Sequence, residues 1–169
     1  MIQVYTGNGK GKTTAALGQA LRALGHGWKV LMIQFMKGDP DYGELKAARL
    51  LPGFEIVQSG LATFVEKGNP TLEDVRLARQ GLALAQRAIA GRRCQMLILD
   101  EINVAIDYGL VSLDEVLALA RDCPGEMELV LTGRYAPPKL LELADLVSEV
   151  REIKHPYTRG VVSREGVDR

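Results

Sequence analysis

The stretch Thr6-Gly7-Asn8-Gly9-Lys10-Gly11-Lys12-Thr13-Thr14 constrains what this chain can fold into more than any other part of its sequence. It lies between an apolar run and a helical pattern, where a glycine-rich turn leaves backbone N–H groups free to bind a polyphosphate. Lys12 adds a full positive charge, and the hydroxyl of Thr13 is placed to coordinate Mg²⁺. The residues predicted to bind phosphate are Gly7, Asn8, Gly9, Lys10, Gly11, Lys12, Thr13 and Thr14.

The spacing of this loop departs from the usual one of glycine, four residues and then Gly-Lys-Ser/Thr. Counting back from Gly11 places Thr6 at the first position. The nearest glycine is Gly7, which makes the loop one residue shorter. Its place between a strand and a helix is nevertheless the context expected of a phosphate-binding loop.

Strand and helix patterns alternate along the chain. Strands are predicted over 2–6, 30–33, 55–58, 96–99, 129–132 and 146–153, and helices over 12–24, 44–50, from 71, from 112 and over 139–144. The apolar strands are continuous rather than alternating, as in parallel sheets covered on both faces. We therefore expect one α/β domain over residues 1–169, a mostly parallel sheet flanked by helices, with a polar tail at 154–169.

Composition narrows the class of protein. The 21 basic and 21 acidic residues cancel, so the basic excess that general nucleic-acid binding needs is absent. No apolar run approaches the ~20 residues that span a bilayer, and Met1 leads directly into a strand-like segment rather than a signal peptide. Cys94 and Cys123 lack metal-ligand spacing and are expected to be reduced packing residues. We expect a cytoplasmic protein that does not bind membranes.

Asp100 and Glu101 close the apolar run Met96 to Leu99. A carboxylate at such a strand end can hold Mg²⁺ directly or through water. The alternative is a solvated acidic pair that begins the next helix. With the phosphate loop in the same chain, the metal interpretation is preferred, and Glu101 is taken as the nearer ligand.

Other candidates follow strands whose carboxyl ends would meet at the same edge. Arg134 follows a glycine there and would neutralise phosphate charge, although a surface arginine that caps a helix is an equal alternative. Lys37, at the end of the second strand, is a similar but weaker candidate. Phe64, in the middle loop, either stacks on a ligand or anchors the loop. His155 precedes Pro156 in the polar tail and is expected to be structural.

The chemistry is left open by these residues alone. The sequence has no His-Arg-Asp catalytic loop and no serine or cysteine nucleophile motif. A nucleotide site is indicated, but a base that activates an acceptor is not. Three classes fit: an ATPase motor or switch, a small kinase, or an enzyme whose second substrate is itself the nucleophile.

Six sequence blocks in a fixed order narrow this choice. They are Thr-Gly-Asn-Gly-Lys-Gly-Lys-Thr-Thr at 6–14, Gln-Phe-Met-Lys-Gly at 34–38, Leu-Asp-Glu at 99–101, Leu-Thr-Gly-Arg at 131–134, Ala-Asp-Leu-Val-Ser-Glu at 144–149 and Lys-His at 154–155. Together they resemble the P-loop ATP:corrinoid adenosyltransferases, which act on cob(I)alamin and cob(I)yrinic acid a,c-diamide. The shortened loop is part of that family's pattern. One segment departs from it, because residues 60–66 retain Phe64 as their only aromatic side chain.

The resemblance implies a RecA-like P-loop fold and a distinctive reaction. Reduced cobalt(I) attacks the 5′ carbon of ATP, and triphosphate leaves. Because cobalt(I) is a strong nucleophile, no general base is needed. The protein instead holds the triphosphate and neutralises its charge.

The same resemblance implies roles for particular residues. Gly7 to Lys12 would bind the phosphates, Thr13 and Glu101 would hold Mg²⁺ (or Mn²⁺) with Asp100 beside them, and Arg134 would lie against the polyphosphate. It also implies a corrinoid-reducing flavoprotein as partner and a homodimer. The remaining alternatives are a small P-loop kinase or ATPase, and a nucleotide-dependent corrinoid carrier without turnover.

Overall fold

A computed structural model of the chain describes residues 1–156, 160 and 164–167. Its strands form one six-stranded parallel sheet in the order β3-β2-β4-β5-β1-β6. They are β1 (Ile2–Thr6), β2 (Val30–Phe35), β3 (Phe54–Ser59), β4 (Met96–Asp100), β5 (Glu128–Thr132) and β6 (Leu146–Glu149). This arrangement confirms the predicted α/β fold with a parallel sheet.

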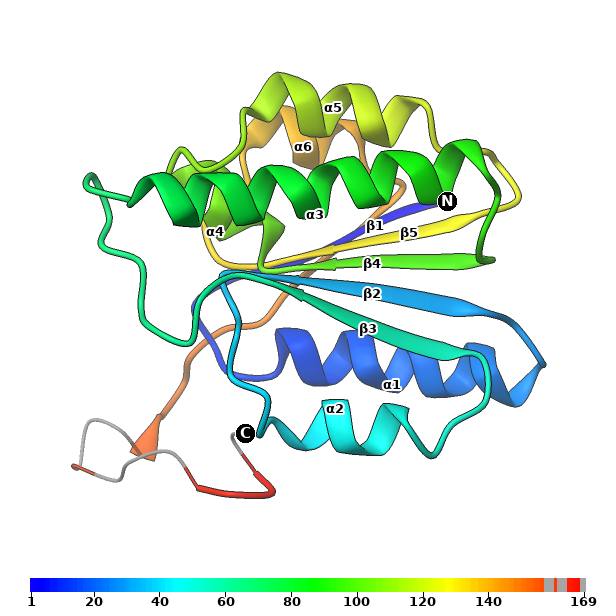
Figure 1. Ribbon diagram of the computed structural model, residues 1–169, viewed down its shortest axis with the longest axis horizontal. Helices are drawn as coiled ribbons and strands as arrows, with labels where there is room; N and C mark the ends of the chain where they lie inside the picture. Colours follow the sequence, from blue (N-terminus) through cyan, green and yellow to red (C-terminus); the bar gives the residue numbers. More distant parts are fainter. Residues whose placement is uncertain (157–159, 161–163, 168–169) are drawn as a thin grey trace.

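Helices cover both faces of this sheet (Figure 1). Two of them, α1 and α2, lie on one face, and α3 to α6 lie on the other. The helices are α1 (Lys12–Gly25), α2 (Gly43–Ala48), α3 (Leu72–Ala90), α4 (Ile102–Asp107), α5 (Leu113–Arg121) and α6 (Pro138–Leu143). Within the described residues, a helix with the length and apolarity needed to cross a membrane does not occur.

The central strands are continuously apolar because each of their faces packs on helices. Successive side chains of a strand point to opposite faces. Met32 and Ile98 belong to the apolar cluster that includes α1. Leu31 and Leu97, one position earlier, belong to the cluster that includes α3 and α5. The sequence rule for parallel strands therefore holds for this sheet.

The N-terminal ends of α3 and α5, the two longer helices on that second face, are fixed by local sequence. Thr71 and Asp74 form a capping box at the start of α3, and Ser112 and Glu115 form the predicted one at α5. Such reciprocal bonds satisfy N–H groups that a helix start leaves without partners. Both helices therefore begin where the sequence indicates.

Most elements lie within two residues of their predicted bounds, and two differ more from the sequence analysis. The strand predicted over 146–153 ends at Glu149, because its pairing partner β1 ends at Thr6. The chain then turns beneath the phosphate loop, where the Val150 carbonyl accepts a hydrogen bond from the Gly9 N–H at 2.8 Å. The short helix α4, directly after Glu101, was predicted only in the alternative interpretation of the acidic pair.

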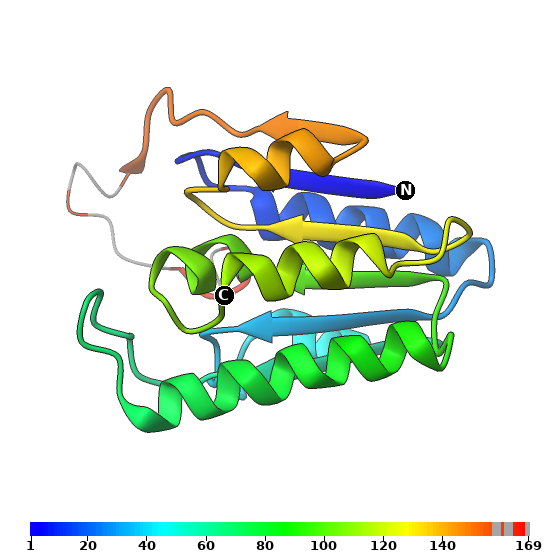
Figure 2. The same ribbon diagram turned by 90° about the horizontal axis from the view of Figure 1, so that it is seen from above.

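Parallel strands bring their carboxyl ends to one edge of the sheet, the left-hand edge in Figure 2. The loops that follow β1, β2, β4 and β5 all lie at that edge. These loops carry the phosphate loop, Lys37, Glu101 and Arg134. The fold therefore gathers residues from four distant parts of the sequence.

Candidate active site

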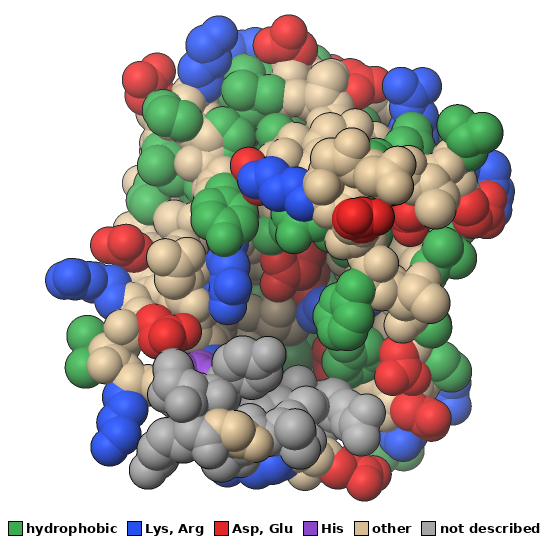
Figure 3. All heavy atoms as spheres, turned by 90° about the vertical axis from the view of Figure 1, so that its left-hand side faces the viewer, with side chains coloured by type: hydrophobic (Ala, Val, Ile, Leu, Met, Phe, Trp, Pro, Cys, Tyr) green, Lys and Arg blue, Asp and Glu red, His purple; other side chains and the backbone are tan. Residues whose placement is uncertain are grey.

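A cavity of about 1000 Å³ opens at this edge. Figure 3 shows the hollow face-on, with acidic and basic side chains close together in it. The predicted site residues that line it are Gly9, Lys10, Gly11, Lys12, Thr13, Thr14, Lys37, Phe64, Glu101 and Arg134. Three other predicted residues, Gly7, Asn8 and Asp100, are not part of its lining.

Lys12 is held within the phosphate loop. Its ammonium donates to the carbonyl of Gly9 at 2.7 Å, and its side chain is almost fully buried. Burial lowers the pKa of Lys12, while the carboxylate of Glu101 opposes that shift. Gly11, with φ of 123°, turns the chain into α1 directly before this lysine. An arriving phosphate would therefore find a positive charge that is already positioned.

Gly7 and Gly9 serve the packing behind the loop. A Cβ added at Gly7 would collide with the carbonyl of Val150, and one at Gly9 would lie 2.7 Å from Arg151. Gly7 also has φ of +98°, which favours glycine. The segment after β6 thus supports the loop from outside the cavity, a role for Gly7 that the motif itself does not indicate.

Asp100 is fully buried behind the cavity wall, and both of its carboxylate oxygens are hydrogen-bonded. Its Oδ1 accepts from the hydroxyls of Thr13 at 2.9 Å and Thr132 at 2.7 Å. Its Oδ2 accepts from Lys37 at 2.8 Å and lies 3.5 Å from Gln34 Nε2. Asp100 is therefore placed to orient the Thr13 hydroxyl and Lys37.

Of the two acidic residues that close β4, Glu101 is the one that lines the cavity. It is the N-cap of α4, in a left-handed conformation with φ of 61°, and its N–H donates to Thr132 Oγ1 at 3.0 Å. Burial raises the pKa of Glu101, and the charge of Asp100 adds to the shift. Glu101 thus begins a helix, as the alternative interpretation expected, but the pair is not solvated, because Asp100 is fully buried. Glu101 also lines the cavity, and its role as a metal ligand stays a prediction.

Lys37 links the second strand to Asp100. Desolvation alone would lower the pKa of Lys37, but its ion pair with Asp100 outweighs burial and raises it. The ammonium also lies 5.6 Å from the ring centroid of Tyr42, another cavity residue. Gln34, beside this pair, donates to Glu44 at 2.9 Å and keeps a buried Oε1 without a partner.

Arg134 stands at the end of β5 with its side chain exposed toward the cavity. The preceding Gly133 has φ of +130° and packs against Asn103, whose Nδ2 donates to the Gly133 carbonyl at 3.1 Å. The N-cap of the next helix is Pro137, so Arg134 does not cap that helix. The guanidinium is placed to contact an anion in the cavity.

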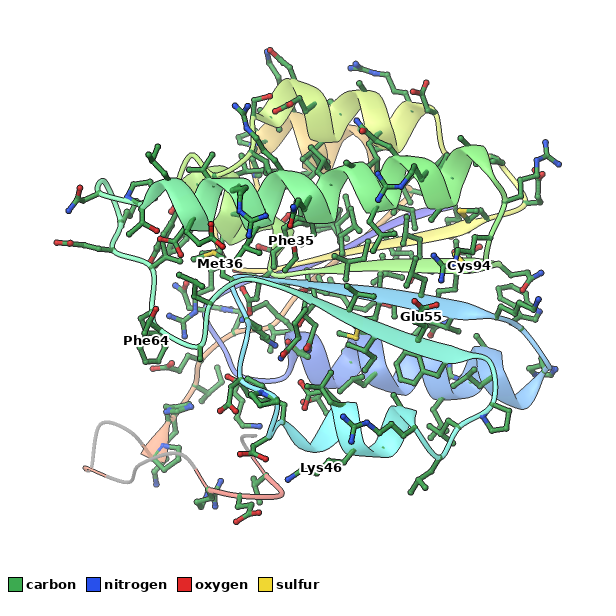
Figure 4. All side chains as sticks on the ribbon, in the orientation of Figure 1. Phe35, Met36, Lys46, Glu55, Phe64 and Cys94 are labelled. Carbon is green, nitrogen blue, oxygen red and sulfur yellow. The ribbon has the colours of Figure 1, made fainter. Side chains whose placement is uncertain are left out.

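An aromatic wall was missed by the sequence analysis. Tyr42, Tyr108 and Tyr135 line the cavity together with Phe64. Figure 4 shows Phe64 on the loop between β3 and α3, directed away from the core near the mouth of the cavity. The tyrosines come from three separate loops, and only the position of Tyr135 beside Arg134 could have marked one of them. His155, expected to be structural, also lies in the lining.

The oxygen donors suit a magnesium ion that is shared with phosphates. Thr13 and Glu101 present a hydroxyl and a carboxylate to the same cavity, and Mg²⁺ prefers such ligands together with water and substrate phosphate. Among residues 1–156, 160 and 164–167, clusters of three or more His, Cys, Asp or Glu that could form a protein-only metal site are absent. The donor set therefore fits a metal that arrives with its nucleotide.

A structural likeness supports the fold. A crystal structure of a KaiC-like protein, PH0186 from Pyrococcus horikoshii OT3, superposes with a TM-score of 0.59 at 15% identity, covering 90% of this chain and 73% of that one. At this identity the likeness concerns the fold alone. It agrees with the predicted RecA-like P-loop fold.

Proteins found by sequence comparison are more similar to this chain than the KaiC-like protein is. A corrinoid adenosyltransferase of Escherichia coli (strain K12) is 37% identical over 171 residues, which cover 99% of this chain and 85% of that protein. One of Pseudomonas aeruginosa is 34% identical, with 99% and 83% covered. The model of the family described as ATP:corrinoid adenosyltransferase BtuR/CobO/CobP matches residues 1–168. The chain therefore belongs to the ATP:corrinoid adenosyltransferase family.

Proposed function

We propose that this protein transfers the 5′-deoxyadenosyl group of ATP to the cobalt(I) of a reduced corrinoid and releases triphosphate. The bond between cobalt and the 5′ carbon forms as the bond from that carbon to the triphosphate oxygen breaks. The observation that carries the proposal is family membership over residues 1–168. The site agrees with it, because a phosphate loop and an open aromatic wall share one cavity of about 1000 Å³.

The basic residues of the cavity account for the leaving group. Triphosphate departs with several negative charges, so catalysis depends on charges already in place when those charges develop. Lys12 and the loop N–H groups would bind the phosphates from one side, and Arg134 would bind them from the rim. Lys37 is paired with Asp100, so its charge is largely balanced and it would contribute less to phosphate binding than Lys12 and Arg134.

Thr13 and Glu101 would hold Mg²⁺ or Mn²⁺ against the phosphates. The metal supplies further charge neutralisation there. Asp100 would not need to touch it, since its two oxygens already accept hydrogen bonds from Thr13, Thr132 and Lys37. Its role would be to accept the hydrogen bond of the Thr13 hydroxyl, which would leave the lone pairs of that oxygen available to the metal.

Product analysis tests the proposal. The protein is incubated anaerobically with ATP, Mg²⁺ and cob(I)alamin, and we expect a photolabile cobalt–carbon product together with inorganic triphosphate. ADP and phosphate as the only products would instead assign it to the P-loop kinases and ATPases. Binding of ATP and corrinoid without turnover would assign it to nucleotide-dependent carriers.

Three finer points belong to the same proposal. Cobalt(I) needs a reductant, so we infer a corrinoid-reducing flavoprotein as its partner. Family resemblance also supports a homodimer, which light scattering on the purified protein would test. A cytoplasmic location fits these partners, and fractionation of cells would test it.

A further inference from the structure

The loop between β3 and α3, residues 60–70, projects at the left of Figure 1 and contributes Phe64 to the lining of the cavity. Phe64 lies in this loop, lines the cavity and is fully exposed. Because Phe64 is not packed in the core, its ring is free to contact a ligand that enters the cavity. How this loop is held therefore decides where that contact surface lies.

The two ends of the loop are fixed by packing and by capping. Gly60 lies so close to the backbone of Met36 and Lys37 that an added Cβ would be 2.5 Å from the Lys37 N atom. At the other end, the capping box of Thr71 and Asp74 starts α3. Between these ends, partly buried Val65 packs on the core.

Lys67 connects the middle of the loop to residues that follow β4 and β5 in the chain. Its ammonium lies 2.6 Å from Oδ2 of Asp107. It also lies 5.6 Å from the ring centroid of Tyr108 and 5.3 Å from that of Tyr135. Hydrogen bonding to Asp107 raises the pKa of Lys67, so the ammonium is charged across the physiological range.

The partners of Lys67 belong to two different elements. Asp107 and Tyr108 are at the end of α4, whereas Tyr135 follows β5 and is the neighbour of Arg134. Tyr135 has φ of 61°, a backbone conformation unusual for a non-glycine residue. Both tyrosines line the cavity. One ammonium therefore joins three segments at its mouth.

We propose that Lys67 is a positioning residue, which holds the Phe64 loop against Tyr108 and Tyr135 so that these aromatic side chains form one surface for the second substrate. This inference rests on the proposed adenosyl transfer for the identity of that substrate, the reduced corrinoid. An isolated exposed ion pair would do little. Here the same cation also meets two aromatic faces, each of which adds to the attraction.

The proposal predicts different effects of Lys67 on the binding of the two substrates. Lys67 contacts Asp107, Tyr108 and Tyr135, which lie outside the phosphate loop, so its loss should spare ATP binding. We expect Lys67→Met to raise the KM for cob(I)alamin about fivefold, the size of effect that losing one ion pair and two cation–aromatic contacts would give. The Kd for ATP should change less than about twofold. Lys67→Arg, which keeps both kinds of contact, should restore the wild-type KM.

Hydrogen exchange tests the positioning without relying on turnover. Amides of residues 61–69 should exchange faster in Lys67→Met than in the wild type, and Lys67→Arg should restore their protection. Asp107→Asn, which leaves Lys67 in place, gives a second variant if Lys67→Met fails to fold, and it should loosen the same amides. Arg92→Met is the matched control, because the exposed pair of Arg92 with Glu126 lies away from the cavity.

Each outcome decides a different question. Unchanged exchange in residues 61–69 overturns the positioning role, and so does an equal rise of the constants for both substrates, which would mean a general structural effect. If the wild type forms no cobalt–carbon bond while Lys67→Met still loosens the loop, the proposed function fails and the positioning stands. If the wild type turns over and the KM for corrinoid does not move, the proposed link to substrate is wrong.

Discussion

The Nζ atom of Lys37 lies 2.8 Å from Oδ2 of Asp100, a carboxylate with no exposed surface. Because of this pair, the two acidic residues at the end of β4 have different roles. Asp100 is saturated by donors inside the protein, and Glu101 is left to face the cavity. The division follows from geometry, because consecutive residues at a strand end point in different directions.

Removal of Lys37 should therefore destabilise the fold. Lys37→Met leaves the buried Asp100 charge without its cation, and breaking one side of a buried pair costs about 3 kcal/mol. We expect the free energy of unfolding, measured by urea titration at pH 7, to fall by about that amount. The double variant Lys37→Met, Asp100→Asn should recover much of the loss.

An exposed pair gives the matched control for this experiment. Lys46 lies 3.6 Å from Asp41, and both side chains are largely exposed. Lys46→Met should lower the free energy of unfolding by less than about 1 kcal/mol, since solvent screens such pairs. Equal losses in Lys37→Met and Lys46→Met would show that Asp100 does not depend on Lys37.

Replacement of Glu101 should stabilise the fold at high pH, whereas replacement of Lys37 should destabilise it. Burial raises its pKa above the ordinary value of 4.5. A group whose pKa is higher in the folded protein stabilises the fold below its unfolded pKa, and this contribution is lost as the pH rises through the folded pKa. Glu101→Gln has no carboxyl group that ionises at this position, so the variant does not lose this stability as the pH rises. In EDTA without nucleotide, the variant should melt above the wild type at pH 8 and together with it near pH 4.

Glu73 supplies the comparison, because its pair with Arg76 lowers rather than raises the pKa of Glu73. Glu73→Gln should not melt above the wild type at pH 8. A constant difference between Glu101→Gln and the wild type at all pH values would contradict the assignment to the Glu101 carboxyl. Glu101→Gln should also weaken the Mg²⁺ dependence of turnover.

Much of this site could be predicted from sequence because its residues sit at fixed places in the chain pattern. Lys12 and Thr13 follow a strand and open a helix, and Glu101 and Arg134 directly follow apolar runs. A parallel sheet brings such positions to one edge. The order of the strands within the sheet did not need to be known for that step.

The aromatic wall could not be predicted in the same way. Tyr108 ends a six-residue helix without a capping signal, and Lys67 lies in a loop with no hydrophobic period. Their meeting depends on how α4 and the β3–α3 loop pack in space. Local sequence does not indicate such contacts. Phe64 was identified as a candidate only because it is the single aromatic residue of its segment.

Lys12 should matter for turnover rather than for folding. Its side chain is buried and its pKa is lowered by that burial, so Lys12→Met of similar length should leave the urea midpoint close to that of the wild type. Loss of one preorganised charge at a departing phosphate costs about 100- to 1000-fold in rate. Triphosphate release under anaerobic conditions should fall by that factor. Lys29→Met, at the opposite end of the sheet, should keep full activity.

Substitution of alanine for a glycine should have opposite effects on the free energy of unfolding in the phosphate loop and in the adjoining helix. Gly7→Ala places a Cβ against the Val150 carbonyl and requires φ of +98°, so we expect the free energy of unfolding to drop by more than about 2 kcal/mol. Gly18, inside α1, has open space around it. Gly18→Ala should therefore raise the free energy of unfolding by about 0.5–1 kcal/mol.

The pair of variants separates backbone support from phosphate contact. If Gly7 served only to let a phosphate approach, Gly7→Ala would lose nucleotide affinity and keep its stability. Support from the segment after β6 predicts the reverse order, with unfolding at lower urea even without nucleotide. Urea titrations of Gly7→Ala and Gly18→Ala, each with and without ATP, distinguish the two, and an unchanged midpoint for nucleotide-free Gly7→Ala would rule out the support by Val150.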